Sequence, residues 1–450
     1  MPRLFGTDGV RGIANRDLTG ELAHALGRAA VIALALEGTA APRIVVGRDT
    51  RASGEFLEAA LAAGICSAGG TAVMAGVCTT PGVAFLTRDI GAEAGAVISA
   101  SHNPADYNGI KFFASTGYKL ADDAEDQIEE IVRSDKGPRP TGRGVGRIEA
   151  LSDATDRYLE FLRNSAPSDL SGMRIVVDCA NGAAFEIAPA LLRSLGADVI
   201  SMNDGPDGWN INEGSGATAP EVVGAAVVDS GADAGVAHDG DADRAMFADA
   251  SGNVIDGDQV VAACAIDMKG RGELAGDQVV ATVMANMGFR KAMAAAGIRI
   301  LETKVGDRYV LEEMLRSGAV LGGEQSGHII FLRHATTGDG LLTAVQFLGL
   351  ARRKGVSVGD LAGSMSKFPQ VLSNVRVTAS DGLQDADEVW DAVRRAEQLL
   401  GDRGRVLVRP SGTEPLVRVM VEAPTEEEAR THADAISDVV AKALAASEYD

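Results

Sequence analysis

Three aspartates at alternate positions mark the segment HDGDADR, residues 238–244, which follows the apolar run AGVA. Asp239, Asp241 and Asp243 carry the oxygen ligands that Mg²⁺ prefers, and on an extended loop this spacing can turn all three toward one cation. An EF-hand begins similarly, but Arg244 stands where that loop needs glycine and Ala250 where it needs glutamate. The ordinary alternative is an acidic surface turn, since short motifs often match by chance. Because the loop ends an apolar strand, we favour a metal site.

A second polar loop, SASHNP at residues 99–104, ends the apolar run GAVI. Neighbouring residues of an extended chain point apart, so His102 is predicted to be a poor general base for Ser101. This argues against a hydrolase dyad. A serine without a base, close to a metal loop, is better explained as a phosphate carrier. Asn103 and Pro104 turn the chain, and the next apolar run returns Lys111 toward the same place.

The third polar loop, GGEQSGH at residues 322–328, offers Glu324, Ser326 and His328 between glycines. Carboxylate and hydroxyl groups on a bare backbone suit the recognition of sugar hydroxyls, and a histidine can titrate near neutral pH. The alternative is a glycine-rich turn whose histidine only hydrogen-bonds the backbone. Taken alone, the motif favours that alternative.

A fourth loop, RPSGTEP at residues 409–415, lies between two expected strands. Successive backbone N–H groups and two hydroxyls form a nest for a phosphate dianion, and Arg409 can add a bidentate contact. A plain hairpin turn is the alternative, because glycine and serine serve turns well. The arginine favours phosphate.

The elements that carry these loops repeat along the chain. Apolar β-branched strands are expected at 43–47, 174–178 and 277–284, and each is followed by a helical segment and a second strand. Each unit then runs into one of the first three polar loops. Ligands of open α/β sheets bind beyond the carboxyl ends of the strands, so the loops can converge on one cleft.

We therefore predict an α/β protein of four domains. Three related α/β domains with mixed sheets are expected at 1–150, 151–252 and 253–365, and a smaller C-terminal α+β domain at 366–450. The stretch 137–150, rich in glycine and proline, is expected to be the first linker.

Composition narrows the class of protein. The 450 residues carry a formal net charge of −21, which argues against nucleic acid or an anionic membrane as a partner. The four cysteines form no C-x-x-C pair, as expected of buried thiols in a reducing compartment. No stretch is apolar enough for a membrane span and the N-terminus lacks a signal-peptide pattern, so a soluble cytoplasmic protein is predicted.

The four motifs SASHNP, DGDADR, GEQSGH and RPSGTEP, in this order, resemble the signatures of the α-D-phosphohexomutases. The likeness runs from Leu4 to about Glu422. The family fold consists of four domains arranged in a heart shape around a central cleft. The opening FGTDGVRG and the glutamine of GEQSGH are most similar to the bacterial branch that acts on glucosamine phosphates. Ala242 stands where many members have glycine, and little consequence is expected because it is not a ligand.

The resemblance implies a role for each motif residue. Ser101 carries the phosphate as phosphoserine and shares one Mg²⁺ with Asp239, Asp241 and Asp243. The residues that steady the phosphoryl group or move protons are Arg11, Arg244, Lys111 and His328. The residues that hold the sugar are Glu324, Ser326 and, in the loop KVGDRYV, Gly306, Asp307 and Arg308. The residues that hold the phosphate that does not react are Arg409, Ser411, Gly412 and Thr413.

The implied activity is the interconversion of glucosamine 6-phosphate and glucosamine 1-phosphate, with a sugar bisphosphate as intermediate and activator. Its product would feed UDP-N-acetylglucosamine synthesis. The partner is then a small-molecule sugar phosphate, and a homodimer is left open. Three alternatives remain: a family member acting on glucose or mannose phosphates, a non-catalytic sugar-phosphate sensor, and a Mg²⁺-dependent phosphatase.

Overall fold

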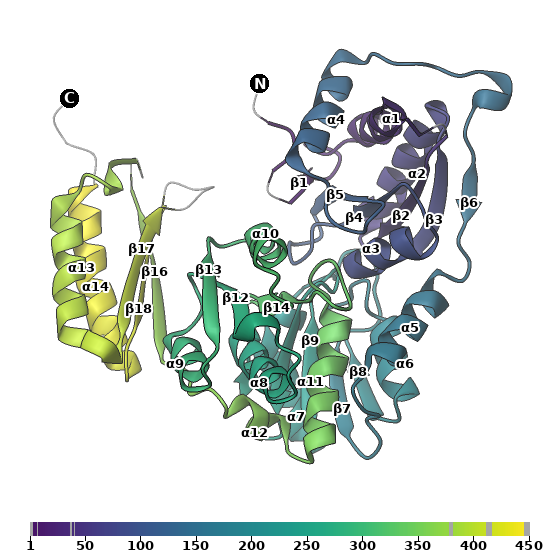
Figure 1. Ribbon diagram of the computed structural model, residues 1–450. Helices are drawn as coiled ribbons and strands as arrows, with labels where there is room; N and C mark the ends of the chain where they lie inside the picture. The colour runs from purple at the N-terminus through teal and green to yellow at the C-terminus, as the bar shows by residue number, and fades with distance from the viewer. Residues whose placement is uncertain are drawn as a thin grey trace. The chain divides into compact units, whose positions relative to one another are not determined.

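The chain divides into two compact units, and the computed structural model describes residues 3–6, 8–36, 38–39, 41–377, 381–410 and 416–444. The larger unit comprises Met1–Met284 and Gly297–Ser364, and the smaller comprises Ala285–Ala296 and Met365–Asp450. Three β-sheets belong to the larger unit and one to the smaller (Figure 1).

The first sheet of the larger unit has the strand order β1-β5-β4-β2-β3-β6. Its strands are β1 (Val10–Ile13), β2 (Arg43–Arg48), β3 (Thr71–Val77), β4 (Ala94–Ile98), β5 (Tyr107–Ala114) and β6 (Ile148–Ala150). Its helices are α1 (Gly20–Leu36), α2 (Ala52–Ser67), α3 (Thr80–Asp89) and α4 (Asp122–Ser134). β2 is parallel to β3 and β4, whereas β5 is antiparallel to β4 and β1. The sheet is therefore mixed, as predicted.

The second sheet has the order β11-β10-β9-β7-β8. Its strands are β7 (Arg174–Asp178), β8 (Asp198–Met202), β9 (Ala234–His238), β10 (Ala245–Asp249) and β11 (Val254–Ile255). Its helices are α5 (Ala154–Ser165), α6 (Ile187–Ser194) and α7 (Pro220–Ser230). β7 is parallel to β8 and β9, and β10 is antiparallel to β9.

The third sheet has the order β13-β12-β14-β15. Its strands are β12 (Gln278–Thr282), β13 (Arg299–Thr303), β14 (Leu321–Gly323) and β15 (Ile329–Phe331). The helices of this part of the chain are α8 (Gly257–Gly270), α9 (Met287–Ala295), α10 (Asp307–Ser317), α11 (Gly340–Lys354) and α12 (Val358–Ala362). β12 is parallel to β13 and β14, and β15 is antiparallel to β14.

One plan underlies all three sheets. A central strand pairs in parallel with the next two strands of the chain, and the second of these turns back as an antiparallel hairpin. The three hairpin connections are β4–β5, β9–β10 and β14–β15. They contain the three polar loops, so the repeat seen in the sequence places its chemistry at equivalent points of three related domains.

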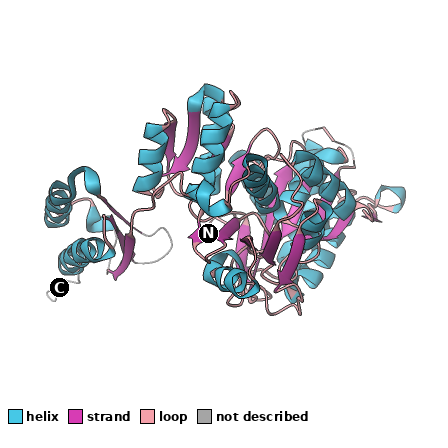
Figure 2. Cartoon of the chain, turned by 90° about the horizontal axis from the view of Figure 1, so that it is seen from below, coloured by secondary structure: helices cyan, strands magenta, loops and turns pink. Residues whose placement is uncertain are grey.

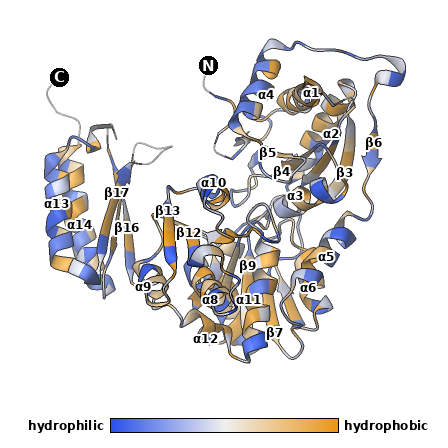
Figure 3. Cartoon of the chain, in the orientation of Figure 1, coloured by the Kyte–Doolittle hydropathy of each residue, from blue (hydrophilic) through white to orange (hydrophobic). Residues whose placement is uncertain are grey.

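Apolar side chains fill the space between the strands and their helices. Figure 2 shows strands lying between helices, and the middle of β12, residues 279–281, is apolar and buried (Figure 3). One buried cluster joins α1, α2 and strands of the first sheet through Leu26, Leu57, Leu61, Ile44 and Phe112. Burial of such side chains stabilises each by about 1.5–3 kcal/mol. This packing fixes the strands whose ends carry the polar loops.

The smaller unit has a three-stranded antiparallel sheet, ordered β16-β18-β17. Its strands are β16 (Gln370–Arg376), β17 (Arg405–Pro410) and β18 (Leu416–Glu422), and its long helices are α13 (Asp387–Leu400) and α14 (Glu426–Ala443). Helix α9 belongs to this unit, because Met287 N and the Asn286 amide donate to the Glu422 carboxylate (2.9 and 3.2 Å). The C-terminal domain is α+β, as predicted.

The stretch expected to be only a linker adds a strand to the first sheet. After a single 3₁₀ turn at Gly142–Gly144, β6 pairs in parallel with β3 and forms an edge of the sheet. All three residues of β6 are exposed, so the sequence has no alternation of buried apolar and polar residues that would predict a strand here. Only the register with β3 reveals it.

Candidate active site

The serine loop is held in an unusual backbone shape. Ser101 has a φ of 50°, in the left-handed region that residues with a side chain rarely adopt, and is 2% exposed. Arg51, fully buried, donates to the carbonyl oxygens of Ser101, Asn103 and Pro104 at 2.6–2.9 Å. Asp49 orients that guanidinium at 2.9 Å. The loop is therefore fixed in a shape that presents Ser101.

The left-handed backbone changes the relation between Ser101 and His102. The expectation that the two side chains point apart assumed an extended chain, and it is wrong here: Nδ1 of His102 lies 3.4 Å from Ser101 Oγ. This is a long contact for a hydrogen bond. Burial, with the charges of Arg244 and Arg11 nearby, lowers the pKa of His102 to about 4. A group that holds a proton so weakly is a poor base at neutral pH, which argues against a hydrolase dyad for a reason other than side-chain direction.

Ser101 meets the metal loop directly. Its hydroxyl donates to Asp239 Oδ2 at 2.7 Å, across 138 residues of sequence. Asp239, Asp241 and Asp243 are all buried and offer carboxylate oxygens within 4.8 Å of one another. Oδ1 of Asp241 and Oδ1 of Asp243 are buried without a hydrogen-bond partner among the described residues. Buried unpaired carboxylate oxygens at this spacing fit a hard divalent cation.

The electrostatics of the three carboxylates agree with that assignment. Burial and then the charge of a neighbouring aspartate raise the pKa of each of them. Three negative charges in one dry pocket repel one another, and a bound cation would relieve the repulsion. The residues present therefore fit a metal site.

The backbone of the metal loop is strained at Ala242 and is held there by a hydrogen bond from another part of the chain. Ala242 has a φ of 56°, so a residue with a Cβ occupies a position that favours glycine. Consequently the expectation that alanine has little effect here overlooked backbone strain. The amide of Gly340 donates to the Ala242 carbonyl at 2.9 Å, which holds the loop in this shape.

Two positive side chains approach the serine loop from the first sheet. Arg11 on β1 stands opposite Gly109 on the adjacent strand β5, which also carries Lys111. Both basic side chains form ion pairs with Asp8, and the distance from Lys111 Nζ to Asp8 Oδ1 is 2.6 Å. Burial lowers the pKa of Arg11, although Asp241 opposes the effect. Sequence reasoning found Lys111 and Arg11 but missed Asp8, which stands in the same motif.

Arg244 follows the metal loop and lies beside its carboxylates. Its amide donates to Asp239 Oδ1 at 3.3 Å, and its Nε is 3.9 Å from Asp239 and 3.8 Å from Asp243. Burial opposes the charged form of Arg244, but the negative charges of Asp239 and Asp243 prevail and raise its pKa. The guanidinium therefore places a positive charge at the edge of the carboxylate cluster.

The third polar loop, residues 322–328, which we call the sugar loop after its expected role, contacts the metal loop. The backbone of His328 bridges to that of Arg244, and its ring is 3% exposed. Nε2 lies 4.0 Å from both Asp243 and Asp307, and neither ring nitrogen has a hydrogen-bond partner among the described residues. Gly338 packs so closely on the ring that a Cβ there would overlap it. The histidine ring is thus fixed in position beside the metal loop.

The loop KVGDRYV is brought to the same place. Glu324 accepts from the Gly306 amide at 3.1 Å, which joins it to the start of α10. Burial opposes ionisation of Asp307, but the charges of His328 and Lys111 prevail and lower its pKa. A pocket of about 270 Å³ opens here, lined by Lys111, Asp307 and His328 among others.

Arg308 has a protein partner that the sequence did not predict. Its guanidinium forms a bidentate pair with Asp122 at the start of α4, with N–O distances of 2.5 and 2.6 Å. The pair joins the first domain to the third along the wall of the 270 Å³ pocket. Ser326 lies half-buried on the sugar loop.

The structure brings together most of the predicted site within the larger unit. The phosphate-loop residues Ser411, Gly412 and Thr413 lie outside the described residues. Arg409 is described, on β17 opposite Arg418, and burial followed by the charge of Arg418 lowers its pKa.

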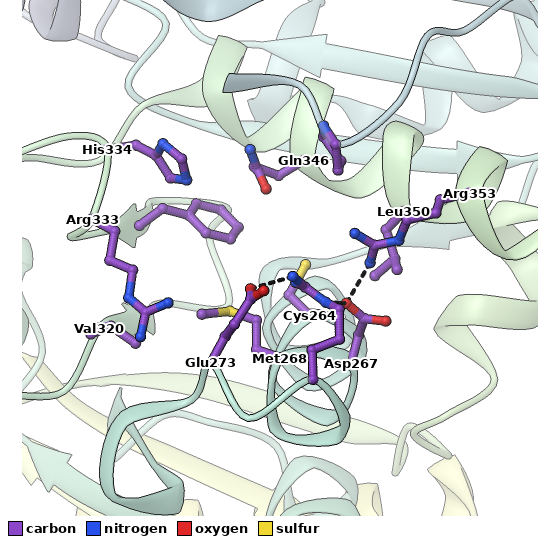
Figure 4. A pocket seen from close by; sticks show the side chains of 13 residues that line it. Cys264, Asp267, Met268, Glu273, Val320, Arg333, His334, Gln346, Leu350 and Arg353 are labelled. Atoms are coloured by element: carbon purple, nitrogen blue, oxygen red, sulfur yellow. Dashed lines mark hydrogen bonds and ion pairs between the residues drawn. The ribbon is translucent and has the colours of Figure 1, made fainter. Parts of the chain in front are cut away.

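A second pocket, of about 300 Å³, lies between α8 and α11 (Figure 4). Arg271 and Arg353 project into it, but both pair with Asp267 at 2.8 and 2.5 Å, and Arg271 also pairs with Glu273. Basic residues at the ends of two helices are the usual complement of the helix dipole. These ion pairs explain the charges without a ligand.

Comparison with protein-family models gives four matches in chain order. Phosphoglucomutase/phosphomannomutase alpha/beta/alpha domains I, II and III match residues 2–138, 156–252 and 256–368, and the C-terminal domain matches 372–439. Together they cover most of the chain.

Curated relatives cover nearly the full length. The chain is 52% identical to a phosphoglucosamine mutase of Desulforamulus reducens over 442 residues (98% of this chain, 99% of the relative). It is 55% identical to that of Pelotomaculum thermopropionicum over 424 residues (94% and 95%).

Solved structures share the fold. A phosphoglucomutase/phosphomannomutase family protein of Burkholderia thailandensis superposes with a TM-score of 0.83 at 24% identity (98% of this chain, 97% of the other). Aspergillus fumigatus N-acetylphosphoglucosamine mutase, solved with GlcNAc-6P and magnesium, gives 0.68 at 18% identity (98% and 96%). No described helix is long and apolar enough to cross a membrane.

Proposed function

Because the chain belongs to the phosphoglucomutase/phosphomannomutase family, we propose that it interconverts glucosamine 6-phosphate and glucosamine 1-phosphate. The observation that carries the proposal is the contact of the buried Ser101 hydroxyl with Asp239, within a cluster of three buried aspartates. The substrate rests on relatives at 52–55% identity that are named phosphoglucosamine mutase. Glucose and mannose phosphates are the neighbouring alternatives within the family.

Mg²⁺ is the proposed cofactor, one per chain. The residues that would hold it are Ser101, Asp239, Asp241 and Asp243, and Oδ1 of each of the last two accepts no hydrogen bond among the described residues. When bound, such a cation neutralises charge on a transferring phosphoryl group. A phosphoserine brings a charge of roughly −1.5 to −2 to a cluster of three carboxylates. Arg11 and Arg244, beside the cluster, supply further positive charge.

The proposed cycle starts with a phosphoryl group on Ser101. The free hydroxyl of the bound sugar phosphate attacks phosphorus, its proton passes to an unprotonated nitrogen of Lys111 or His328, and the bond from phosphorus to Ser101 Oγ breaks. The product is a sugar bisphosphate that stays bound and turns by half a turn. Ser101 Oγ then accepts the other phosphoryl group, and the proton returns to the sugar oxygen that is released. Positioning and charge stabilisation supply the rate enhancement.

The geometry suits this cycle because the reacting groups are dry and held from several domains. Ser101, Lys111 and His328 are all at most 7% exposed. Exclusion of water favours transfer to a sugar hydroxyl over hydrolysis. We assign Glu324, Ser326, Gly306, Asp307 and Arg308 to the sugar, and Arg409 with residues 411–413 to the distal phosphate. A loop that contacts only the phosphate, and not the sugar, would accept either orientation of the bisphosphate.

A comparison of substrates tests the proposal. We would measure kcat/KM for glucosamine, glucose and mannose phosphates with Mg²⁺ and a trace of sugar bisphosphate, and follow inorganic phosphate in parallel. The expected result is a large preference for glucosamine phosphate with almost no phosphate release. A preference for a neutral sugar would overturn the substrate but keep the mutase, stoichiometric phosphate release would indicate a phosphatase, and absence of turnover would favour a sensor.

A further inference from the structure

Thr80 reaches the metal loop from another domain. It opens helix α3 of the first domain, whereas Asp241 belongs to the second. Thr80 Oγ1 donates to Asp241 Oδ2 at 2.5 Å, and the Thr80 amide donates to the Asp241 carbonyl at 3.0 Å. Both residues are 1% exposed. Thr80 thus holds both the side chain and the backbone of Asp241, a residue 161 positions later in the sequence.

The two oxygens of Asp241 are thereby made different. Oδ2 is occupied by the threonine hydroxyl, whereas Oδ1 is buried without a partner among the described residues. A carboxylate fixed through one oxygen presents the other in a defined direction, and groups that orient metal ligands in this way commonly change metal affinity 10–100-fold when removed.

Thr80 is itself held rigidly. Thr79 caps α3 by accepting from the Gly82 amide at 3.0 Å, and Pro81 occupies the first turn, where its fixed φ suits a helix. The hydroxyl therefore has little freedom to follow a misplaced aspartate.

We propose that Thr80 is a positioning residue that directs Oδ1 of Asp241 toward the divalent cation, so that the first domain completes the metal site of the second. This inference rests on the metal site of the proposed function. It assigns Thr80 no contact with the cation or the substrate.

The test is metal binding by the full-length protein, independent of turnover. We would titrate wild type and Thr80→Val with Mn²⁺ and with Mg²⁺, by electron paramagnetic resonance and calorimetry. Valine keeps the shape and removes the hydroxyl. The expected result is a dissociation constant about 10–100-fold higher. Thr80→Ser, which restores a hydroxyl, should bind within a few-fold of wild type.

Thr87 in the same helix is the matched control. It is fully buried, and its hydroxyl donates within the helix to the Val83 carbonyl at 2.8 Å. Thr87→Val removes an equally buried hydroxyl and should leave metal affinity unchanged.

Three results would overturn the inference: unchanged affinity in Thr80→Val, equal weakening in Thr87→Val, or loss of affinity in a Thr80→Ser protein whose circular dichroism matches wild type. If Thr80→Val does not fold, a loss of metal affinity in a folded Thr80→Ser protein would still overturn the inference. Failure of wild type itself to bind either ion would remove the proposed cofactor, and this inference with it.

Discussion

Asp339 is a buried carboxyl group whose ionisation should be visible in the stability of the protein. It caps helix α11 by accepting from the Leu342 amide at 2.9 Å, and it accepts from the Tyr158 hydroxyl at 2.7 Å. Burial raises its pKa to about 6 despite these two hydrogen bonds. The Asp339→Asn variant keeps a side-chain oxygen for the helix cap and has no charge to bury.

The sign follows from linkage between protonation and folding. The pKa is 3.8 for an unperturbed aspartate and about 6 in the folded chain, so the folded state binds the proton more tightly. The contribution of this proton to stability is fully present below pH 4 and is lost as the pH rises through 6. The difference of about two pKa units corresponds to on the order of 2 to 3 kcal/mol, most of which is lost between pH 4 and 7.

The assay is urea unfolding of wild type and Asp339→Asn across this range. The stability of the variant relative to wild type should increase by on the order of 2 kcal/mol from pH 4 to pH 7. Asp229→Asn on α7, where the side chain is exposed, is the control and should follow wild type. Parallel curves for wild type and Asp339→Asn would refute the reasoning, because they would mean that the carboxyl titrates alike in both states.

Three further predictions concern the metal loop and the pocket wall. Because burial and mutual repulsion raise the pKa values of the metal-loop aspartates, protons should compete with the cation, and Mn²⁺ affinity should weaken as pH falls from 7.5 to 5; a pH-independent dissociation constant in a binding titration would contradict this. Ala242→Gly should stabilise the protein by about 1 kcal/mol in urea unfolding by relieving the left-handed backbone, and a loss of stability would show that the alanine methyl matters more. A double-mutant cycle of Arg308→Ala and Asp122→Ala should give a coupling of about 0.5–1 kcal/mol, since the pair is bidentate but partly exposed, and Arg308→Ala should raise KM more than Asp122→Ala does; zero coupling would refute the pair.

The loops were predictable because their signals are local. Asp239, Asp241 and Asp243 stand within five residues, directly after an apolar strand, and the same strand–helix–strand pattern precedes all three polar loops. The strand–helix–strand periodicity therefore predicted the α/β domains, and the polar loops that end these strands do lie close together, as the Ser101–Asp239 hydrogen bond and the Arg244–His328 bridge show.

The residues that hold the loops were missed because their partners are far away in sequence. Thr80 looks like an ordinary helix start, and only the fold brings it to a partner 161 positions later. Tyr158 and Asp339 are 181 positions apart. No local pattern encodes such pairs.

Backbone conformation was the other gap. The left-handed shape of Ser101 is imposed by Arg51, whose hydrogen bonds to three carbonyl groups cross about 50 residues. An extended loop was the natural assumption for adjacent polar residues, and it placed His102 wrongly. Strained residues of this kind gather where a site needs them.

The most direct test of the account is whether Ser101 carries the phosphate. Wild type and Ser101→Ala would be incubated with glucosamine 1,6-bisphosphate and Mg²⁺, and their intact masses measured before and after addition of glucosamine 6-phosphate. We predict that wild type gains one phosphoryl group, located on Ser101 by peptide mapping, and passes it to the sugar, whereas Ser101→Ala gains none and does not turn over. A phosphoryl group on another residue, or turnover by Ser101→Ala near the wild-type rate, would contradict the account.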